Sequence, residues 1–155
     1  MPITSNIGGP LFLGNNLTTK VDGTLPNIGT PILEQSFSIS AVASTVTTAT
    51  SVVNYQVQIP PNSTITGFTF DLITAWNSNT SANLKIGTNS GGTDYVSSQD
   101  LKALTPGRVS ITYTPAQLSS MYNVGTFTTV MATVASTGTT SAGFGTIQVQ
   151  YIQGS

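Results

Sequence analysis

Residues 53–59 read VNYQVQI, and apolar and polar side chains alternate through the whole stretch. A period of two places every apolar side chain on one face of a β-strand and every amide on the other face. The segment PPNS at residues 60–63 then ends the run with residues that favour turns. The stretch therefore predicts a strand with one face toward a core and one face toward solvent.

The same alternation recurs along the chain after residue 35. It is clearest in SFSISA at residues 36–41, RVSITYT at 108–114 and IQVQY at 147–151. β-branched and aromatic residues also dominate residues 65–72, where Gly67 is expected to mark a bulge. About eight such runs separated by turn signals predict an all-β, antiparallel β-sandwich, with a jelly-roll-like arrangement preferred.

One short segment, TPAQLSSMY, is the exception and has helical character. Thr114 can cap its amino end, and Pro115 suits the first helical position. Leu118, with Met121 or Tyr122, is expected to form one apolar stripe. The segment predicts a single short helix between strands.

The first 35 residues differ from the rest, because glycine and proline interrupt them every few positions. We expect two parts: an extended N-terminal arm at residues 1–35 and a β-sandwich domain at residues 36–155. The apolar residues of the arm are candidate contacts with a partner surface: Leu11, Phe12, Leu13, Ile32 and Leu33. Leaving such side chains in water costs up to about 2 kcal/mol each. The alternatives are a passive tail and an irregular first layer of the domain.

Charged residues are scarce: the chain has four Lys or Arg, five Asp or Glu, no His and no Cys among 155 residues. Catalysis by His or Cys is excluded, and clustered cations for nucleic acid are lacking. Without cysteine there is no disulfide, and no apolar run approaches the length of a membrane helix. The low charge also leaves little repulsion between copies, so self-association, most simply as a homotrimer, is expected.

The remaining chemistry would have to come from carboxylates or serines. Ser81 and Ser98 each precede a lysine by four residues, a spacing that chance explains in so serine-rich a chain. The carboxylates are expected to be isolated surface or turn groups rather than a catalytic pair: Asp22, Glu34, Asp71, Asp94 and Asp100. No zinc ligand set and no calcium loop is present. We therefore expect no enzyme activity, no metal and no cofactor.

Trp76 and Asn77 follow the run that ends at Leu72, in the segment TAWNSN. A loop aromatic beside amides can stack on a sugar or anchor an interface. The other interpretation is a tryptophan that covers the end of the sandwich. Both residues are kept as candidate interface residues.

The stretch from Phe68 to Val96 resembles small virion proteins of tailed bacteriophages. The resemblance rests on a strand followed by TAWN, then LKIGT at residues 84–88, then GTDYV at 92–96. The stretch is similar to capsid decoration or cement proteins with jelly-roll or related sandwich folds. Because these motifs are structural turns, the resemblance implies no catalytic residue.

The resemblance implies a virion structural protein on the capsid surface. Its partner would be the major capsid protein, and it would stabilise the assembled shell. The alternative is a tail-fibre or spike domain that binds a receptor or glycan through Trp76, Asn77 and Asn79. Few charges, threonine-rich strands and an apolar arm fit a permanent part of a shell.

Overall fold

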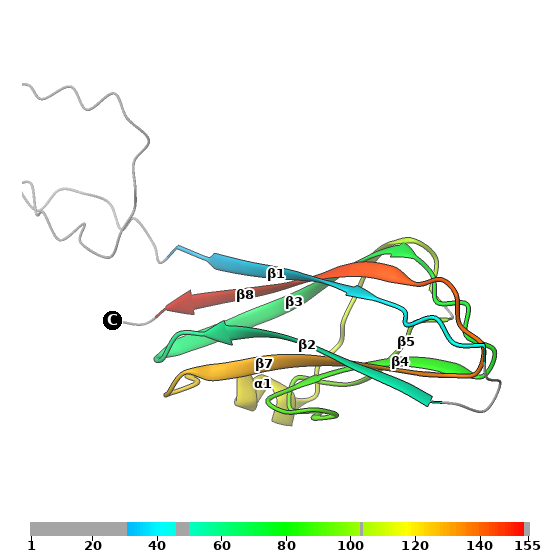
Figure 1. The fold of residues 1–155 in the computed structure, drawn as a ribbon. Coiled ribbons are helices and arrows are strands. Elements are labelled where there is room, and N and C mark those ends of the chain that lie inside the picture. Colours follow the sequence, from blue (N-terminus) through cyan, green and yellow to red (C-terminus); the bar gives the residue numbers. More distant parts are fainter. Residues whose placement is uncertain (1–30, 46–49, 103, 154–155) are drawn as a thin grey trace, which may run out of the picture.

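The computed structural model describes residues 31–45, 50–102 and 104–153. Two four-stranded antiparallel sheets pack face to face, and Figure 1 shows them as two layers. One sheet has the order β1-β8-β3-β6 and the other β2-β7-β4-β5. In chain order the elements are β1 (Leu33–Ser40), β2 (Thr50–Ile59), β3 (Ser63–Thr74), β4 (Ser81–Gly87), β5 (Val96–Asp100), β6 (Gly107–Val109), α1 (Pro115–Met121), β7 (Thr128–Thr137) and β8 (Phe144–Gln153).

The strand pairing is that of a jelly roll. Strands β1 and β8, β2 and β7, β3 and β6, and β4 and β5 pair antiparallel, so the chain forms one long nested hairpin. Pairing of β8 with β3 and of β7 with β4 then rolls this hairpin into two sheets. The expected all-β sandwich is confirmed, and so is its jelly-roll order.

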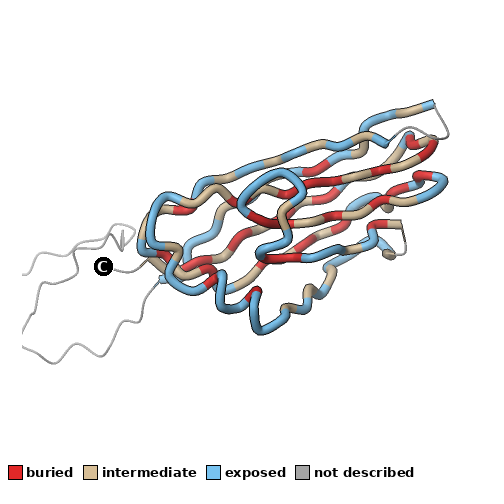
Figure 2. Tube along the Cα trace, turned by 90° about the horizontal axis from the view of Figure 1, so that it is seen from below, coloured by how far each residue is buried: buried red, intermediate tan, exposed pale blue. Residues whose placement is uncertain are grey.

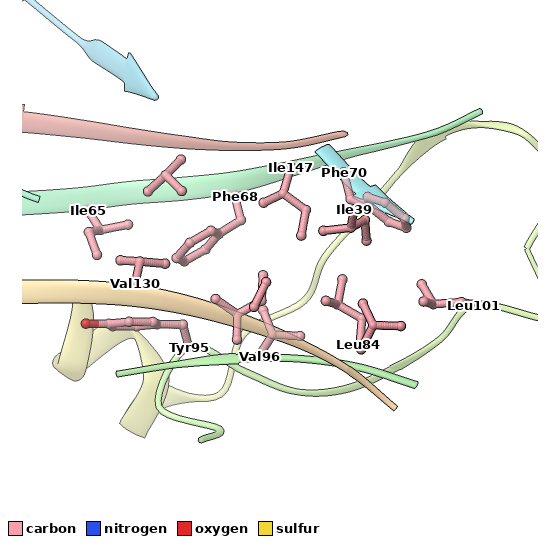
Figure 3. Close-up of a cluster of buried hydrophobic side chains, with 14 of the residues drawn as sticks. Ile39, Ile65, Phe68, Phe70, Leu84, Tyr95, Val96, Leu101, Val130 and Ile147 are labelled. Carbon is pink, nitrogen blue, oxygen red and sulfur yellow. The ribbon is translucent and has the colours of Figure 1, made fainter. Parts of the chain in front are cut away.

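The core lies between the sheets, and buried residues alternate with more exposed ones along most of the long strands (Figure 2). Phe70 and Ile147 come from one sheet and Leu84 and Val130 from the other, and all four side chains are fully buried. The ring of Tyr95 packs against Phe68, with 5.6 Å between ring centroids (Figure 3). The period of two in the sequence therefore corresponds to this inner face.

Two tyrosine hydroxyls bind backbone at the rims of the sandwich. The hydroxyl of Tyr113 accepts a hydrogen bond from the N–H of Phe68 at 2.8 Å and donates to its carbonyl at 3.3 Å. Tyr55 in β2 binds the N–H and carbonyl of Ser40 in β1 in the same way, at 2.9 and 3.0 Å. Burial raises the pKa of Tyr113, which keeps its hydroxyl protonated as a donor. Each hydroxyl thus satisfies one backbone N–H and one carbonyl that, in the described part of the chain, no neighbouring strand pairs with.

Two local expectations have different outcomes. The pairing of β3 shifts register between Ile65 and Gly67, so the expected bulge is present. The run at residues 108–114 was expected to be one strand, but only Gly107–Val109 pairs with β3. Beyond Val109, the Tyr113 side chain contacts β3 in place of a paired backbone, because its hydroxyl binds the backbone of Phe68.

Helix α1 begins as expected but buries a different face. The Thr114 side chain accepts from the Gln117 N–H and the Gln117 side chain binds the Thr114 N–H, which completes a capping box. The expected stripe with Leu118 or Tyr122 is wrong, because both side chains are exposed. Gln117 and Met121 are buried instead. The Gln117 amide donates to the Thr93 carbonyl and the Ser97 hydroxyl, so hydrogen bonds decide how this helix docks.

In the described part of the chain, no helix is long and apolar enough to cross a membrane.

Candidate functional site

The apolar residues expected to contact a partner fall into two groups. Leu11, Phe12 and Leu13 lie outside the described residues. Ile32 and Leu33 are described, and their side chains are 63% and 37% exposed. Leu33 is the first residue of β1 and lies opposite Tyr151 of β8. The sandwich therefore begins inside the segment assigned to the arm, because residues 33–35 already pair as strand.

Trp76 is enclosed, at 2% exposure, rather than presented at the surface. Its ring lies against Gly143, the residue before β8: a Cβ atom on this glycine would come within 2.6 Å of three ring atoms. The indole Nε1 is buried, and among the described residues it has no hydrogen-bond partner. Trp76 thus closes one end of the sandwich, and no face of its ring is open for stacking on a sugar.

Asn77 ties two loops together. Its Oδ1 accepts from the backbone N–H groups of Ser141 and Ala142, both at 2.9 Å, and its Nδ2 donates to the Ser141 hydroxyl at 2.8 Å. The Asn77 N–H also donates to the Ala142 carbonyl. The carboxamide is therefore used within the fold, where it fixes the connection between β7 and β8 against the Trp76 loop.

Asp94 holds the turn that follows β4. Its Oδ2 accepts from the backbone N–H and the hydroxyl of Thr88, each at 2.9 Å. These two hydrogen bonds hold the pKa of Asp94 below its ordinary value of 3.8. The loop from Thr88 to Asp94 lies on the outer face of the second sheet, because the Gly91 N–H donates to the Thr133 hydroxyl. The GTD motif is thus a structural turn.

Replacing Asp94 by asparagine is expected to lower the free energy of unfolding by about 1 kcal/mol at pH 7. Since the folded-state pKa is depressed, the contribution is present above the unfolded pKa and is lost as pH falls through the folded pKa. Urea unfolding of both proteins at pH 7 and at progressively lower pH measures this. The difference in free energy of unfolding between the unmodified protein and the variant should shrink below pH 3.8. Thr88→Ser keeps both donors and is the control; a difference independent of pH would contradict the assignment.

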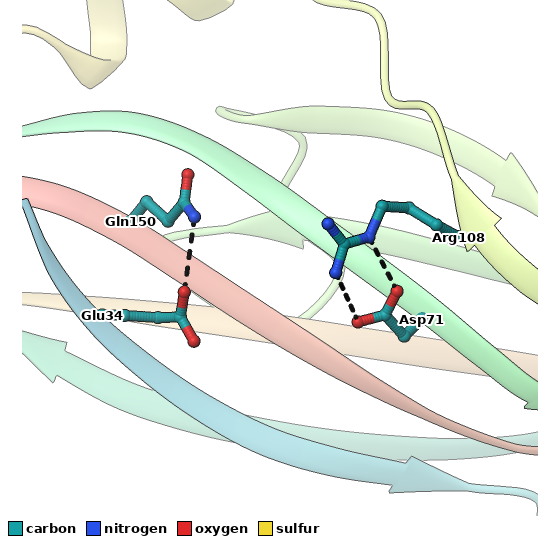
Figure 4. Close-up of polar contacts among 4 residues, drawn as sticks. All are labelled: Glu34, Asp71, Arg108 and Gln150. Carbon is teal, nitrogen blue, oxygen red and sulfur yellow. Dashed lines mark hydrogen bonds and ion pairs between the residues drawn. The ribbon is translucent and has the colours of Figure 1, made fainter.

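The other described carboxylates are also bound within the fold. The guanidinium of Arg108 makes two hydrogen bonds to Asp71, at 3.0 and 3.3 Å, and the Gln150 amide donates to Glu34 at 3.3 Å (Figure 4). Asp100 accepts from the Lys102 N–H. The described residues contain no group of three metal-ligating side chains.

Polar groups on the outer face of the β2-β7-β4-β5 sheet are engaged within the fold. On the second sheet, Asn54 binds both Thr133 and Ser90, and the 88–94 loop leaves Thr133 only 4% exposed. Along that sheet, β2 is an outer strand that pairs only with β7. The alternation in VNYQVQI predicted a strand with one face toward a core but not its position at an edge. The stretch gave no signal of that position, because it lacks the charges, glycine and proline that commonly mark edge strands.

Comparison of the chain with protein-family models, curated proteins and solved structures finds no match.

Proposed function

We propose that this chain is a virion structural protein, a capsid cement or decoration protein that binds the major capsid protein and stabilises the assembled shell. The observation that carries the proposal is the nested pairing of eight strands in jelly-roll order, an arrangement common in viral capsid domains. A fold by itself hosts many functions, so the proposal also needs the surface chemistry.

The described polar groups that could perform chemistry serve the fold instead. Asp94 closes its own turn, Asn77 joins two loops, and Trp76 seals the end of the sandwich. What remains available is surface with few charges, together with the apolar arm. Such a molecule is suited to lasting contact with other subunits.

Stabilisation of the shell would follow from mass action. A protein that binds only the assembled lattice lowers the free energy of that state and opposes disassembly. The arm is the proposed clamp, through Leu11, Phe12 and Leu13, with Ile32 and Leu33 exposed where the described chain begins. The glycan-binding alternative receives no support from Trp76, since its ring is enclosed.

Deleting residues 1–30 tests the clamp. The sandwich should remain folded with a modestly lower melting temperature, because β1 begins only at Leu33. Retention on purified particles should fall by about tenfold or more, since three buried apolar side chains contribute several kcal/mol before the ordering entropy is subtracted.

The triple substitution Leu11→Ser, Phe12→Ser and Leu13→Ser keeps the arm's length and should reproduce the loss. Thermal melting paired with co-sedimentation on particles measures both effects. If the shortened protein remains on particles as tightly as the full chain, the arm is a passive tail. If the full protein sediments with tails rather than with capsids, the proposed location is wrong.

A further inference from the structure

The edge strands on the two flanks of the sandwich are protected to different degrees against pairing with other chains. On one flank, β6 has three residues, β5 has five, and the pairing of β5 with β4 is irregular. Arg108 and Asp100 place charges on these strands. Short length, irregular pairing and charge are the devices by which proteins prevent edge strands from pairing with other chains.

On the opposite flank, strand β2 lacks those devices. This flank is formed by β1 and β2, which lie near one another as outer strands of different sheets (Figure 1). Strand β2 runs for ten residues with no charged residue, glycine or proline, and it pairs with β7 in continuous register without a bulge. A long, regular, uncharged edge is a template for strand addition.

A hydrogen bond from β1 shows which backbone groups of β2 face the open side. The Gln58 carbonyl accepts from the side chain of Gln35, which comes from β1 and not from β7. Because backbone direction alternates along a strand, Val52, Asn54 and Gln56 direct their N–H and carbonyl groups the same way. These groups have no partner in the described part of the chain.

We propose that this edge pairs antiparallel with β2 of a second copy of this chain, about a two-fold axis at Tyr55. That register places Asn54 opposite Gln56 of the second copy and Val52 opposite its Gln58. The open N–H and carbonyl groups of Asn54 then face those of Gln56 in the second copy, and each contact occurs twice, as a two-fold axis requires.

The side chains along the edge favour a second copy as the occupant. The outward-facing residues of β2 are Thr50, Val52, which is 54% exposed, and three amides, so no like charges meet across the axis. The net charge of −1 adds little repulsion between copies. This contact gives dimers in place of the trimer expected from composition, and it does not depend on the capsid proposal.

Gln56→Pro is the sharpest test. Proline removes an N–H that faces the open edge and not β7, so the fold should keep its own ladder. Light scattering and sedimentation equilibrium of the purified full-length protein should show a dimer, and the variant should raise the dimer dissociation constant at least about tenfold. Gln56→Lys should act similarly, because it places two like charges near the axis.

Gln148→Lys is the matched control, because it makes the same exchange on the outer face of the central strand β8 and should leave the dimer unchanged. Circular dichroism and melting of each variant show whether it folds. A monomer or a trimer of the unmodified protein overturns the proposal, as does a dimer equally sensitive to Gln148→Lys. A folded Gln56→Lys variant that dimerises as tightly as the unmodified protein also overturns it.

Discussion

Replacing Gly143 by alanine is expected to lower the free energy of unfolding by about 3 kcal/mol or more. Two effects add at this position: the new Cβ would come within 2.6 Å of the Trp76 ring, and φ is +153°, where L side chains are strained. The ring cannot easily withdraw, because Trp76 is 2% exposed and the adjacent Asn77 is bound to Ser141 and Ala142. The β7–β8 connection would have to shift instead.

Gly107→Ala separates the two effects. Gly107 has a similar φ of +137°, but nothing lies within 4 Å of the added Cβ. Its expected loss is backbone strain alone, about 1 kcal/mol. Urea unfolding of both variants, with the near-ultraviolet signal of the single tryptophan, measures the difference. Equal losses in the two variants would show that the contact between Trp76 and Gly143 contributes nothing.

Replacing Gly87 by alanine is the second large expected effect, again about 3 kcal/mol. A Cβ at Gly87 would lie 2.5 Å from the carbonyl carbon and 2.8 Å from the Cα of Gly92, and 2.8 Å from an oxygen of Asp94. Two of these atoms are backbone, so the whole turn must move. That movement would weaken the Asp94–Thr88 bonds and uncover the buried Thr133.

Gly91→Ala in the same loop is the comparison. Gly91 has φ of +73°, and nothing lies within 4 Å of its added Cβ, so the expected loss is about 1 kcal/mol of strain. Amide hydrogen exchange at residues 88–94 should rise in Gly87→Ala. Should Gly91→Ala prove the more damaging of the two, close packing of Gly87 on Gly92 would not be what holds this turn.

Local chemistry predicted several parts of the structure because the required groups are close in sequence. The alternation in VNYQVQI predicted a strand with one inner face, and Tyr55, Val57 and Ile59 do lie on that face. The Thr114 cap and the bulge near Gly67 also follow from residues within a few positions of one another. Asp94 was expected to bond its own turn, and it does.

Long-range contacts decided what local patterns could not. Leu118 was expected to face inward because it is apolar, yet the buried Gln117 finds partners on Thr93 and Ser97, more than 19 positions away. For Trp76 the sequence allowed two interpretations, an exposed loop residue and a residue covering the end of the sandwich. Gly143, 67 positions later, lies against its ring and encloses it. A residue's neighbours across the fold cannot be read from its own segment.

The sequence by itself determined the class of fold, because the period of the apolar residues dictates strands with one buried face. The absence of His and Cys likewise excluded whole classes of chemistry. Only the tertiary structure decided that VNYQVQI lies at an edge and that Trp76 is enclosed. It also decided that the backbone of β3 at Phe68 binds the Tyr113 hydroxyl. The reason is physical: periodicity fixes which face of a strand is apolar, whereas the order of strands in a sheet is fixed by which distant segments pack and pair best.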